Sequence, residues 1–478
     1  MNLNPPANNA PADCSEVNKF IRSVQENGTN PVLSSPCDQN LCGSESMESE
    51  SGCLISAALS QLPVDDREKA FDEIHGVLGL PNVSRDFMDT KVRALQEQLR
   101  LSILRQNDQG ARAFALATIR NVEFAYSSTA CERFLIASDF DVLKATSAML
   151  RYFDLKFQLW GEKKLGAEIE LDDLNETDIE VLKMGYFQVL PERDRAGRQI
   201  CTVVLKNQKI PSVQCAARVL WYTFQQRLDQ PSEFMTVWVF FHLTQSSCKI
   251  MDSSMLQMYQ QLLTTLPWKK AACHHCLADD TSQHFHSFLG QLLSPLDSAN
   301  RAKTKVHSGS FNDWINSLST YGIPPHIIPI NDDGRIRVKN HLEFLQGRKT
   351  GELLLRRGET NVIYLPLNSD ILFGRGKPIQ QTPGNLRLSA IVDSFVSEYH
   401  RRNKQEKTAL ATQIVEMVKS ASGRFLSKNS GIWMVVSDDI AREKVSGLFR
   451  TLYRKRFEGE DERGMDAMES NEVVSRMA

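Results

Sequence analysis

The spacing of hydrophobic and polar positions divides the chain into a helical part and a part in which strands and helices alternate. Between residues 63 and 157, apolar side chains recur every three or four positions, which is typical of amphipathic helices. Past residue 180, β-branched and aromatic runs alternate with helical stretches. The runs at 200–205 and 233–243 predict strands, and the stretches at 214–230, 253–266 and 282–293 predict helices. This alternation predicts helices packed on a mostly parallel sheet, after a bundle of about five helices.

The first helix of the bundle is expected to begin at Val64, because two acidic residues follow in its first turn, where the helix dipole favours them. Four apolar residues then come at helical spacing and predict one buried face: Phe71, Ile74, Val77 and Leu78.

The C-terminal part has its own pattern. Residues 331–369 contain two short strand-like runs and predict a linker with little core of its own. From Asp370 onward, the pattern predicts two helices, a hairpin that turns at 428–431, and a third helix that Ser437 caps. This order indicates a compact α+β unit.

The two ends of the chain are poor in apolar side chains and cannot offset the entropy of ordering. The predicted fold class is therefore a multidomain protein with disordered termini, a helical bundle, an α/β sheet domain and a small α+β domain. Its expected parts are a disordered acidic tail (1–55), the bundle (56–160), the sheet domain (161–330), the linker (331–369), the basic α+β domain (370–457) and a second disordered tail (458–478).

Charge is spread unevenly along the 478 residues, although the formal total is only −2. Residues 1–53 carry a net charge of −5, whereas residues 370–456 carry +8. Such asymmetry favours an anionic partner for the C-terminal unit. The acidic tail could also bind this unit and mask it.

No segment predicts a membrane span or a secretory signal. The longest apolar run, 234–243, is far shorter than the ~20 residues needed to cross a bilayer. The N-terminus lacks a basic start followed by an apolar stretch, and ten cysteines in so long a chain do not indicate a disulfide scaffold. We expect reduced thiols and a location in the cytoplasm or the nucleus.

Five segments of the chain stand out between residues 130 and 330: 134–150, the turn Asp194-Arg-Ala-Gly-Arg198 with the strand after it, 259–267, 288–306 and 323–329. In this order they resemble the CRAL-TRIO family of lipid-transfer proteins. The resemblance implies a hydrophobic ligand in an apolar cavity, with a movable helix over its mouth. The residues expected to line it are Trp238, Phe240, Phe285, Phe288, Leu289 and Leu292.

Two observations keep an alternative open for this domain. An apolar helical face usually packs an ordinary core. In addition, the family's terminal Gly-Gly is missing, and Phe241-His-Leu-Thr-Gln245 replaces its acidic segment after the central strand. The alternative is a domain that has kept the fold and lost its lipid.

The most distinctive motif is Asp370-Ile-Leu-Phe-Gly-Arg-Gly-Lys377, followed by Pro383-Gly-Asn385. Together with Gly423-Arg-Phe-Leu426 and Ala441-Arg-Glu-Lys-Val445, it resembles a domain of unknown function that is widespread in diatoms. The two glycines around Arg375 suit a tight turn with exposed amides, although no Walker or dinucleotide motif is present. The residues expected to bind an anion are Gly374, Arg375, Gly376, Lys377, Arg387, Arg401, Arg402, Lys404, Arg424 and Lys428.

Three interpretations of this basic unit remain open. It could bind nucleic acid through phosphate contacts, it could bind an acidic protein or the surface of an anionic membrane, or its charges could form a solvated face without a partner.

One further cluster contains possible zinc ligands: Cys273-His-His-Cys276, with His284 and His286 downstream. Its spacing fits no common zinc pattern, and neighbouring side chains on a strand point to opposite faces, so no metal site is predicted. No catalytic motif is present, and neither an enzyme nor a cofactor is predicted. The sequence thus predicts a non-enzymatic lipid-binding or lipid-sensing protein whose basic module contacts an anionic partner. The alternative is a nuclear nucleic-acid-binding regulator.

Overall fold

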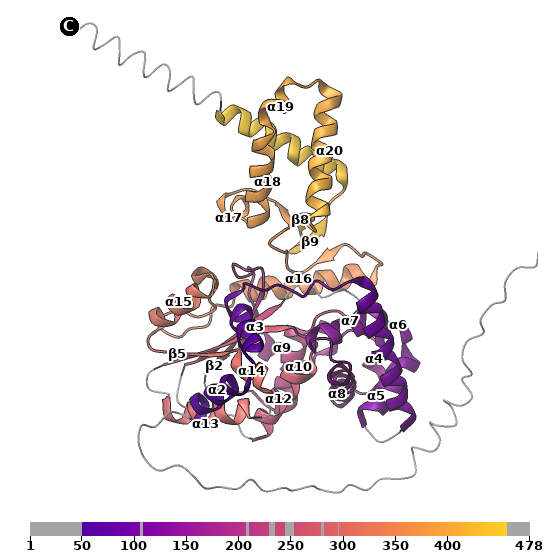
Figure 1. Ribbon diagram of the computed structural model, residues 1–478, viewed down its shortest axis with the longest axis vertical. Coiled ribbons are helices and arrows are strands. Elements are labelled where there is room, and N and C mark those ends of the chain that lie inside the picture. The colour runs from indigo at the N-terminus through magenta and orange to yellow at the C-terminus, as the bar shows by residue number, and fades with distance from the viewer. Residues whose placement is uncertain are drawn as a thin grey trace, which may run out of the picture. The chain divides into compact units, whose positions relative to one another are not determined.

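The computed structural model describes residues 50–105, 109–206, 210–228, 235–243, 253–278, 282–294 and 296–456 (Figure 1). Most of the two tails predicted to be disordered lies outside these ranges. Residues 50–55, which were predicted to belong to the N-terminal tail, are part of helix α2 (Glu50–Gln61). The prediction is wrong for these residues, because their apolar side chains gain a partner only in the folded chain.

A helical bundle is present as predicted, and five helices of the described residues form it. They are α4 (Arg85–Arg105), α5 (Gln109–Arg120), α6 (Val122–Ala125), α7 (Ser128–Ala137) and α8 (Val142–Trp160). The side chains of Ser127 and Asp141 accept hydrogen bonds from backbone N–H groups in the first turns of α7 and α8, which explains where these helices begin. Phe114, Phe134 and Phe153 fill the core between the helices.

Helix α3 (Val64–His75) differs from its prediction. Only Ile74 of the four expected face residues is buried, while Phe71 is 58% exposed and Val77 is 68% exposed. The helix ends at His75, because Gly76 takes a left-handed conformation with φ of 72°. Val77 and Leu78 therefore lie beyond the helix. Ile74 packs on the sheet and not in the bundle.

The central sheet has the order β1-β2-β3-β4-β5. Its strands are β1 (Phe187–Val189), β2 (Gln199–Leu205), β3 (Thr236–His242), β4 (Lys270–Leu277) and β5 (Thr304–Ser308). Strand β1 is antiparallel to β2, and all other pairs are parallel, as predicted. The helices of this domain are α9 (Glu176–Lys183), α10 (Val213–Phe224), α12 (Ser253–Thr265), α13 (Ser282–Leu293), α14 (Ser298–Ala302) and α15 (Phe311–Thr320).

The two faces of the sheet pack against different parts of the chain. Trp238 and Phe240 of β3 share a core with α10, α12 and the bundle. Val239 and Phe241 point to the other face, where they share a core with Trp314 of α15. Every residue of β3 is buried, as expected for a strand covered on both faces.

Residues 331–369 are more ordered than predicted. They contain helix α16 (Lys339–Arg356) and strand β6 (Val362–Ile363). The segment is nevertheless packed against the rest of the fold, because α16 buries His341, Arg348 and Glu352. The buried face of this helix is largely polar or glycine, so no apolar period marks it in the sequence.

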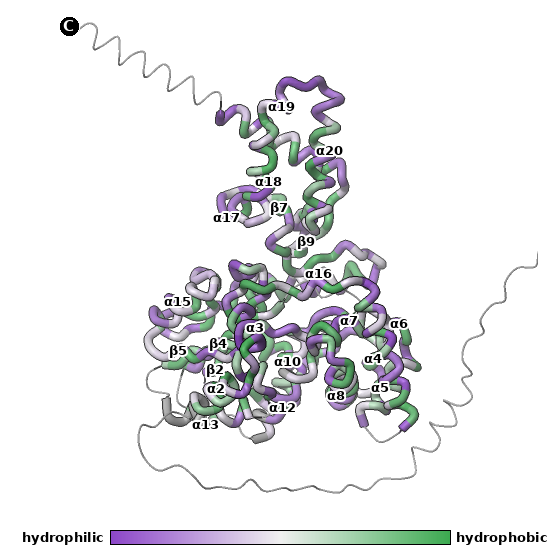
Figure 2. The backbone as a smooth tube through the Cα atoms, in the orientation of Figure 1, coloured by the Kyte–Doolittle hydropathy of each residue, from purple (hydrophilic) through white to green (hydrophobic). Residues whose placement is uncertain are grey.

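The C-terminal unit contains the predicted helices, hairpin and last helix, but it also has a strand and a short helix before them that were not predicted, and two helices take the place of the first predicted helix. It contains β7 (Ile371–Phe373), α17 (Lys377–Gln380), α18 (Pro383–Ser394), α19 (Val396–Arg401), α20 (Lys404–Ser420), β8 (Phe425–Asn429), β9 (Ile432–Val435) and a last helix at 438–456. The sheet order is β6-β9-β8-β7, so β6 joins this unit. Figure 2 shows the connection between α19 and α20 as a hydrophilic stretch.

Candidate functional site

The residues predicted to bind lipid are all buried, but they belong to two clusters. Trp238 and Phe240 lie in the core under α10 and α12, where the Phe240 ring stacks on His275 with 4.7 Å between centroids. Phe285, Phe288 and Leu289 form a separate cluster with Leu277 of β4.

Leu292 of α13 connects the two clusters. A cavity of about 30 Å³ is lined by Trp238 and Phe240 from β3 and by Leu292 and Leu293 from α13. Phe285, Phe288 and Leu289 do not line it. The structure thus brings three of the six predicted residues around one apolar cavity. This volume is far below the roughly 300 Å³ at which ligand pockets usually begin.

A larger, cationic pocket of about 520 Å³ adjoins this cavity. Its charged lining residues are the bases Lys144, Arg151, Lys269, Lys270 and Lys303 and the acids Asp139 and Asp297. The pocket and the apolar cavity share four lining residues: Lys270, Leu296, Asn300 and Lys303. A polar compartment and an apolar one therefore lie side by side at the junction of bundle and sheet.

The sheet topology explains why these lysines meet. Lys270 is the first residue of β4, and Lys303 directly precedes β5. The two strands are neighbours and parallel, so their first residues lie at the same edge of the sheet. The sequence prediction missed these residues. A basic residue at or directly before the start of each of two successive parallel strands is the signal that could have found them.

Most of the charge in the pocket is already paired. Lys303 forms an ion pair with Glu73 of α3, and Lys269 Nζ lies 2.6 Å from Asp139 Oδ1. Burial opposes ionisation of Asp139, but attraction to Lys269 and hydrogen bonds from Lys269 and Lys69 outweigh it and lower the pKa of this carboxyl to about 2. These pairs hold both lysines in fixed positions.

Lys270 is the exception. Its amine has no hydrogen-bond or ion-pair partner within the part of the chain that the structure describes. Burial lowers the pKa of Lys270 and repulsion by Lys303 adds to this effect, while attraction to Asp297 does not offset the lost hydration. An anion beside Lys270 would supply a counter-charge.

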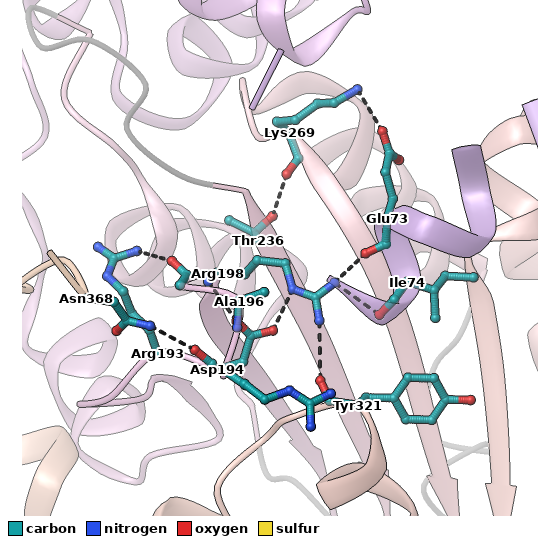
Figure 3. Close-up of polar contacts among 12 residues, drawn as sticks. Glu73, Ile74, Arg193, Asp194, Ala196, Arg198, Thr236, Lys269, Tyr321 and Asn368 are labelled. Atoms are coloured by element: carbon teal, nitrogen blue, oxygen red, sulfur yellow. Dashed lines mark hydrogen bonds and ion pairs between the residues drawn. The ribbon is translucent and has the colours of Figure 1, made fainter. Parts of the chain in front are cut away.

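A buried ion pair anchors α3 and thereby Glu73 (Figure 3). Arg198 Nε lies 2.5 Å from Asp194 Oδ2, and both side chains are almost inaccessible. The Arg198 guanidinium also donates to the backbone carbonyls of Glu73 and Ile74, at the C-terminal end of α3, where the helix dipole favours a cation. Asp194 and Arg198 are the ends of the turn that the sequence analysis singled out, and the structure gives both a positioning role.

The two histidines of β4 each lie beside a histidine of a neighbouring strand. His275 Nδ1 lies 3.2 Å from His242 Nε2 on one face of the sheet, and His274 Nδ1 lies 3.0 Å from His307 Nε2 on the other. Within the described ranges, no group of three or more potential ligands is placed to hold a metal ion. The side chains of His284 and His286 lie outside the described residues.

The residues predicted to bind an anion do not form one surface. Arg401, Arg402 and Lys404 lie where α20 begins, whereas Arg424 and Lys428 follow its far end. A helix of 17 residues is about 25 Å long, so the two groups lie far apart.

Two of these cations are already paired within the unit. Arg424 binds Asp370 through two hydrogen bonds of 3.0 and 2.9 Å, and Arg402 binds Glu398 at 2.5 Å. For Arg424 the expectation of a free phosphate ligand is wrong, because its guanidinium neutralises a buried carboxylate. Arg375, Lys377 and Arg387 are exposed, around the turn in which Gly376 has φ of 95°. Lys428 is also exposed and lies over the Trp433 ring.

The rest of the distinctive motif builds this loop. The Asn385 side chain accepts a hydrogen bond from Leu372 N–H and donates to the carbonyls of Leu372 and Ile379. A Cβ atom at Gly384 would lie 2.0 Å from the carbonyl oxygen of Asp370, so only glycine fits. The motif therefore fixes the loop that carries Arg375 and Lys377.

Fold and sites together define a multidomain α/β protein with a ligand-sized junction pocket and a separate basic α+β unit. Residues 370–451 match the family described as Domain of unknown function (DUF6824). No curated protein matches the chain. Among the described helices, none is both long and apolar enough to cross a membrane.

Proposed function

We propose that the chain is a non-enzymatic lipid-binding protein whose ligand is an anionic amphiphile held where the bundle meets the sheet. The observation that carries this proposal is the shared lining of the cationic pocket and the apolar cavity. An anionic headgroup would lie beside Lys270, and its hydrocarbon chain would lie beside Trp238 and Phe240. The CRAL-TRIO resemblance of residues 130–330 supports the same class of ligand.

The closed apolar cavity has room for little beyond a solvent molecule, so a hydrocarbon chain needs additional space. That space would come from the wall that α13 and α14 provide through Leu292, Leu293 and Asn300. Displacing this wall would open the cavity without breaking the sheet below it.

The experiment is binding of a fluorescent phosphatidic acid to the purified full-length protein, compared with a phosphatidylcholine that carries the same chains. We expect Lys270→Met to weaken phosphatidic acid binding about tenfold, since a hydrogen bond to a charged group is worth roughly 1.5–3 kcal/mol. Phosphatidylcholine binding should change little, because methionine keeps the apolar stem. Lys305→Met is the matched control, because Lys305 is a neighbouring cation outside both compartments.

If the wild-type protein binds neither lipid, the proposed function fails. If Lys270→Met and Lys305→Met weaken binding equally, a lipid binds but not through Lys270.

The second candidate function is nucleic-acid binding by the C-terminal unit, as in a nuclear regulator. Three exposed cations favour it, namely Arg375, Lys377 and Arg387, for which no acidic partner is found in the described part of the chain. An acidic protein or an anionic membrane surface is the other partner that fits these charges. Microscopy of the tagged full-length chain tests the location: a nuclear signal supports this second function, and a cytoplasmic signal supports the lipid carrier.

A further inference from the structure

Helix α2 covers the two helices that form the wall of the apolar cavity. Leu54 and Ile55 of α2 pack against the cluster formed by Phe285, Phe288 and Leu289 of α13. At the end of α2, the Ser298 hydroxyl of α14 donates to Gln61 Oε1 at 3.1 Å. Figure 1 shows α2 beside α13, in agreement with their contacts.

The attachment of α2 differs in kind from that of the next helix, α3. Ala58 is fully buried, whereas Leu54, Ile55 and Leu59 are only half-buried. Helix α3 is held by buried charge, since Glu73 pairs with Lys303 and Arg198 binds the carbonyls at its end. Apolar contacts of half-buried side chains can be lost without leaving a buried charge, whereas moving Glu73 away would leave Lys303 buried without its counter-charge.

The connection between the two helices allows them to move independently. Helix α2 ends at Gln61 and α3 begins at Val64, with Pro63 directly before it. Proline lacks a backbone N–H and cannot continue the hydrogen bonds of the preceding helix. The chain thus has a break between α2 and the anchored helix.

We propose that α2 is a releasable clasp that holds α13 and α14 closed over the apolar cavity, with α3 as its fixed anchor. This inference rests on the proposed function for the identity of the ligand. Release of α2 exposes the apolar face of α13, frees the wall that carries Leu292 and Leu293, and admits the hydrocarbon chain. Lys269 and Lys303 of the cationic pocket stay in place, because Asp139 and Glu73 hold them.

The test uses the full-length double variant Leu54→Asp with Ile55→Asp, which places charge against the apolar cluster of α13. Ser56→Asp with Ala57→Asp is the matched control, because it adds the same two charges at exposed positions of the same helix. Amide hydrogen exchange in α13 and α14 measures local opening of the wall directly and needs no ligand. We expect exchange in α13 and α14 to rise about fivefold or more in the double variant, and exchange in α18 to stay constant.

Uptake of fluorescent phosphatidic acid from vesicles is the second measurement. The initial uptake rate should rise about fivefold in the double variant and stay at the wild-type level in the control, because opening limits access. Unchanged exchange in α13 and α14 would overturn the clasp. Faster exchange with unchanged uptake would overturn its role in ligand access. If no variant takes up lipid, the proposed function fails, while the exchange data still decide whether α2 restrains α13.

Discussion

The sheet domain and the C-terminal unit each contain a similar ion pair. Asp194 binds Arg198 in the sheet domain, and Asp370 binds Arg424 in the C-terminal unit. In each pair, an inaccessible carboxylate binds an arginine side chain and also accepts hydrogen bonds from backbone N–H groups. The rest of the basic residues differ between the two regions. Lys269 and Lys303 of the sheet domain pair with Asp139 and Glu73, whereas exposed cations dominate the C-terminal unit.

This difference shows that net charge alone is a poor guide to a binding site. In the sheet domain, pairing of Lys269 and Lys303 leaves Lys270 without an ion-pair partner among the described residues, which favours one defined anionic group at that position. In the C-terminal unit, the exposed charges lie at two distant ends, which favours an extended polyanion or separate contacts.

The largest expected effect comes from Asp194→Asn. Removing this carboxylate leaves the Arg198 guanidinium buried without its counter-charge, which should destabilise the sheet domain by about 3–5 kcal/mol. Urea unfolding followed by tryptophan fluorescence measures the change. A loss below about 1 kcal/mol would show that the pair behaves like a surface ion pair.

Acid should destabilise the sheet domain before the C-terminal unit. Burial and repulsion by His307 lower the pKa of His275 to about 3, and burial and Lys305 lower the pKa of His307 to about 4. In the unfolded chain these histidines take up protons as the pH falls below about 6.5, whereas in the folded protein they stay neutral. Their full contribution to the free energy of unfolding is therefore present above that pH. The free energy of unfolding should fall toward pH 4 by up to about 1.4 kcal/mol per pH unit for each histidine.

Calorimetry between pH 7 and pH 4 checks this prediction, with the C-terminal unit as the internal reference. That unit contains His400, whose pKa is also lowered by burial, but this histidine is half-exposed. Equal losses in both transitions would contradict the assignment to the paired histidines of the sheet domain.

A smaller effect is expected for Asp370→Asn in the C-terminal unit. Arg424 is 23% exposed, so water can solvate its charge after the carboxylate is removed. We expect a loss of about 2 kcal/mol, between the values for buried and exposed pairs. Asp393→Asn is the matched control, because the Arg456–Asp393 pair is exposed and should contribute less than about 1 kcal/mol. A cost equal to that of the control would show that Asp370 is not a structural anchor.

The smallest effect concerns nucleic-acid binding. If the loop contacts phosphates, Arg375→Ala with Lys377→Ala should weaken binding of random-sequence DNA or RNA to the full-length chain about tenfold. The slope of log affinity against log salt concentration should also become shallower, by the amount that corresponds to about two lost phosphate contacts. Arg401→Ala with Lys404→Ala tests the opposite end of the unit. Equal losses from both double variants would indicate an extended polyanion, and no binding at low salt would exclude this function.

The secondary structure of this protein is largely readable from its sequence. The bounds of α13 agree with prediction, because this helix has a complete apolar face at helical spacing. Strands β2 and β3 were found because β-branched and aromatic residues occupy consecutive positions buried on both faces. Helix α16 was missed, since Arg348 and Glu352 on its buried face read as surface residues until their partners are known.

The sites depended on tertiary structure to a much greater degree. The sequence by itself determined the apolar positions, the basic composition of residues 370–456 and the glycines of the Gly374–Gly376 turn. Only the fold decided that Lys270 faces a pocket without an ion-pair partner among the described residues, while Arg424 is used to neutralise Asp370. The physical reason is that periodicity records which side chains avoid water, whereas a charge acquires its role from neighbours that are distant in the chain.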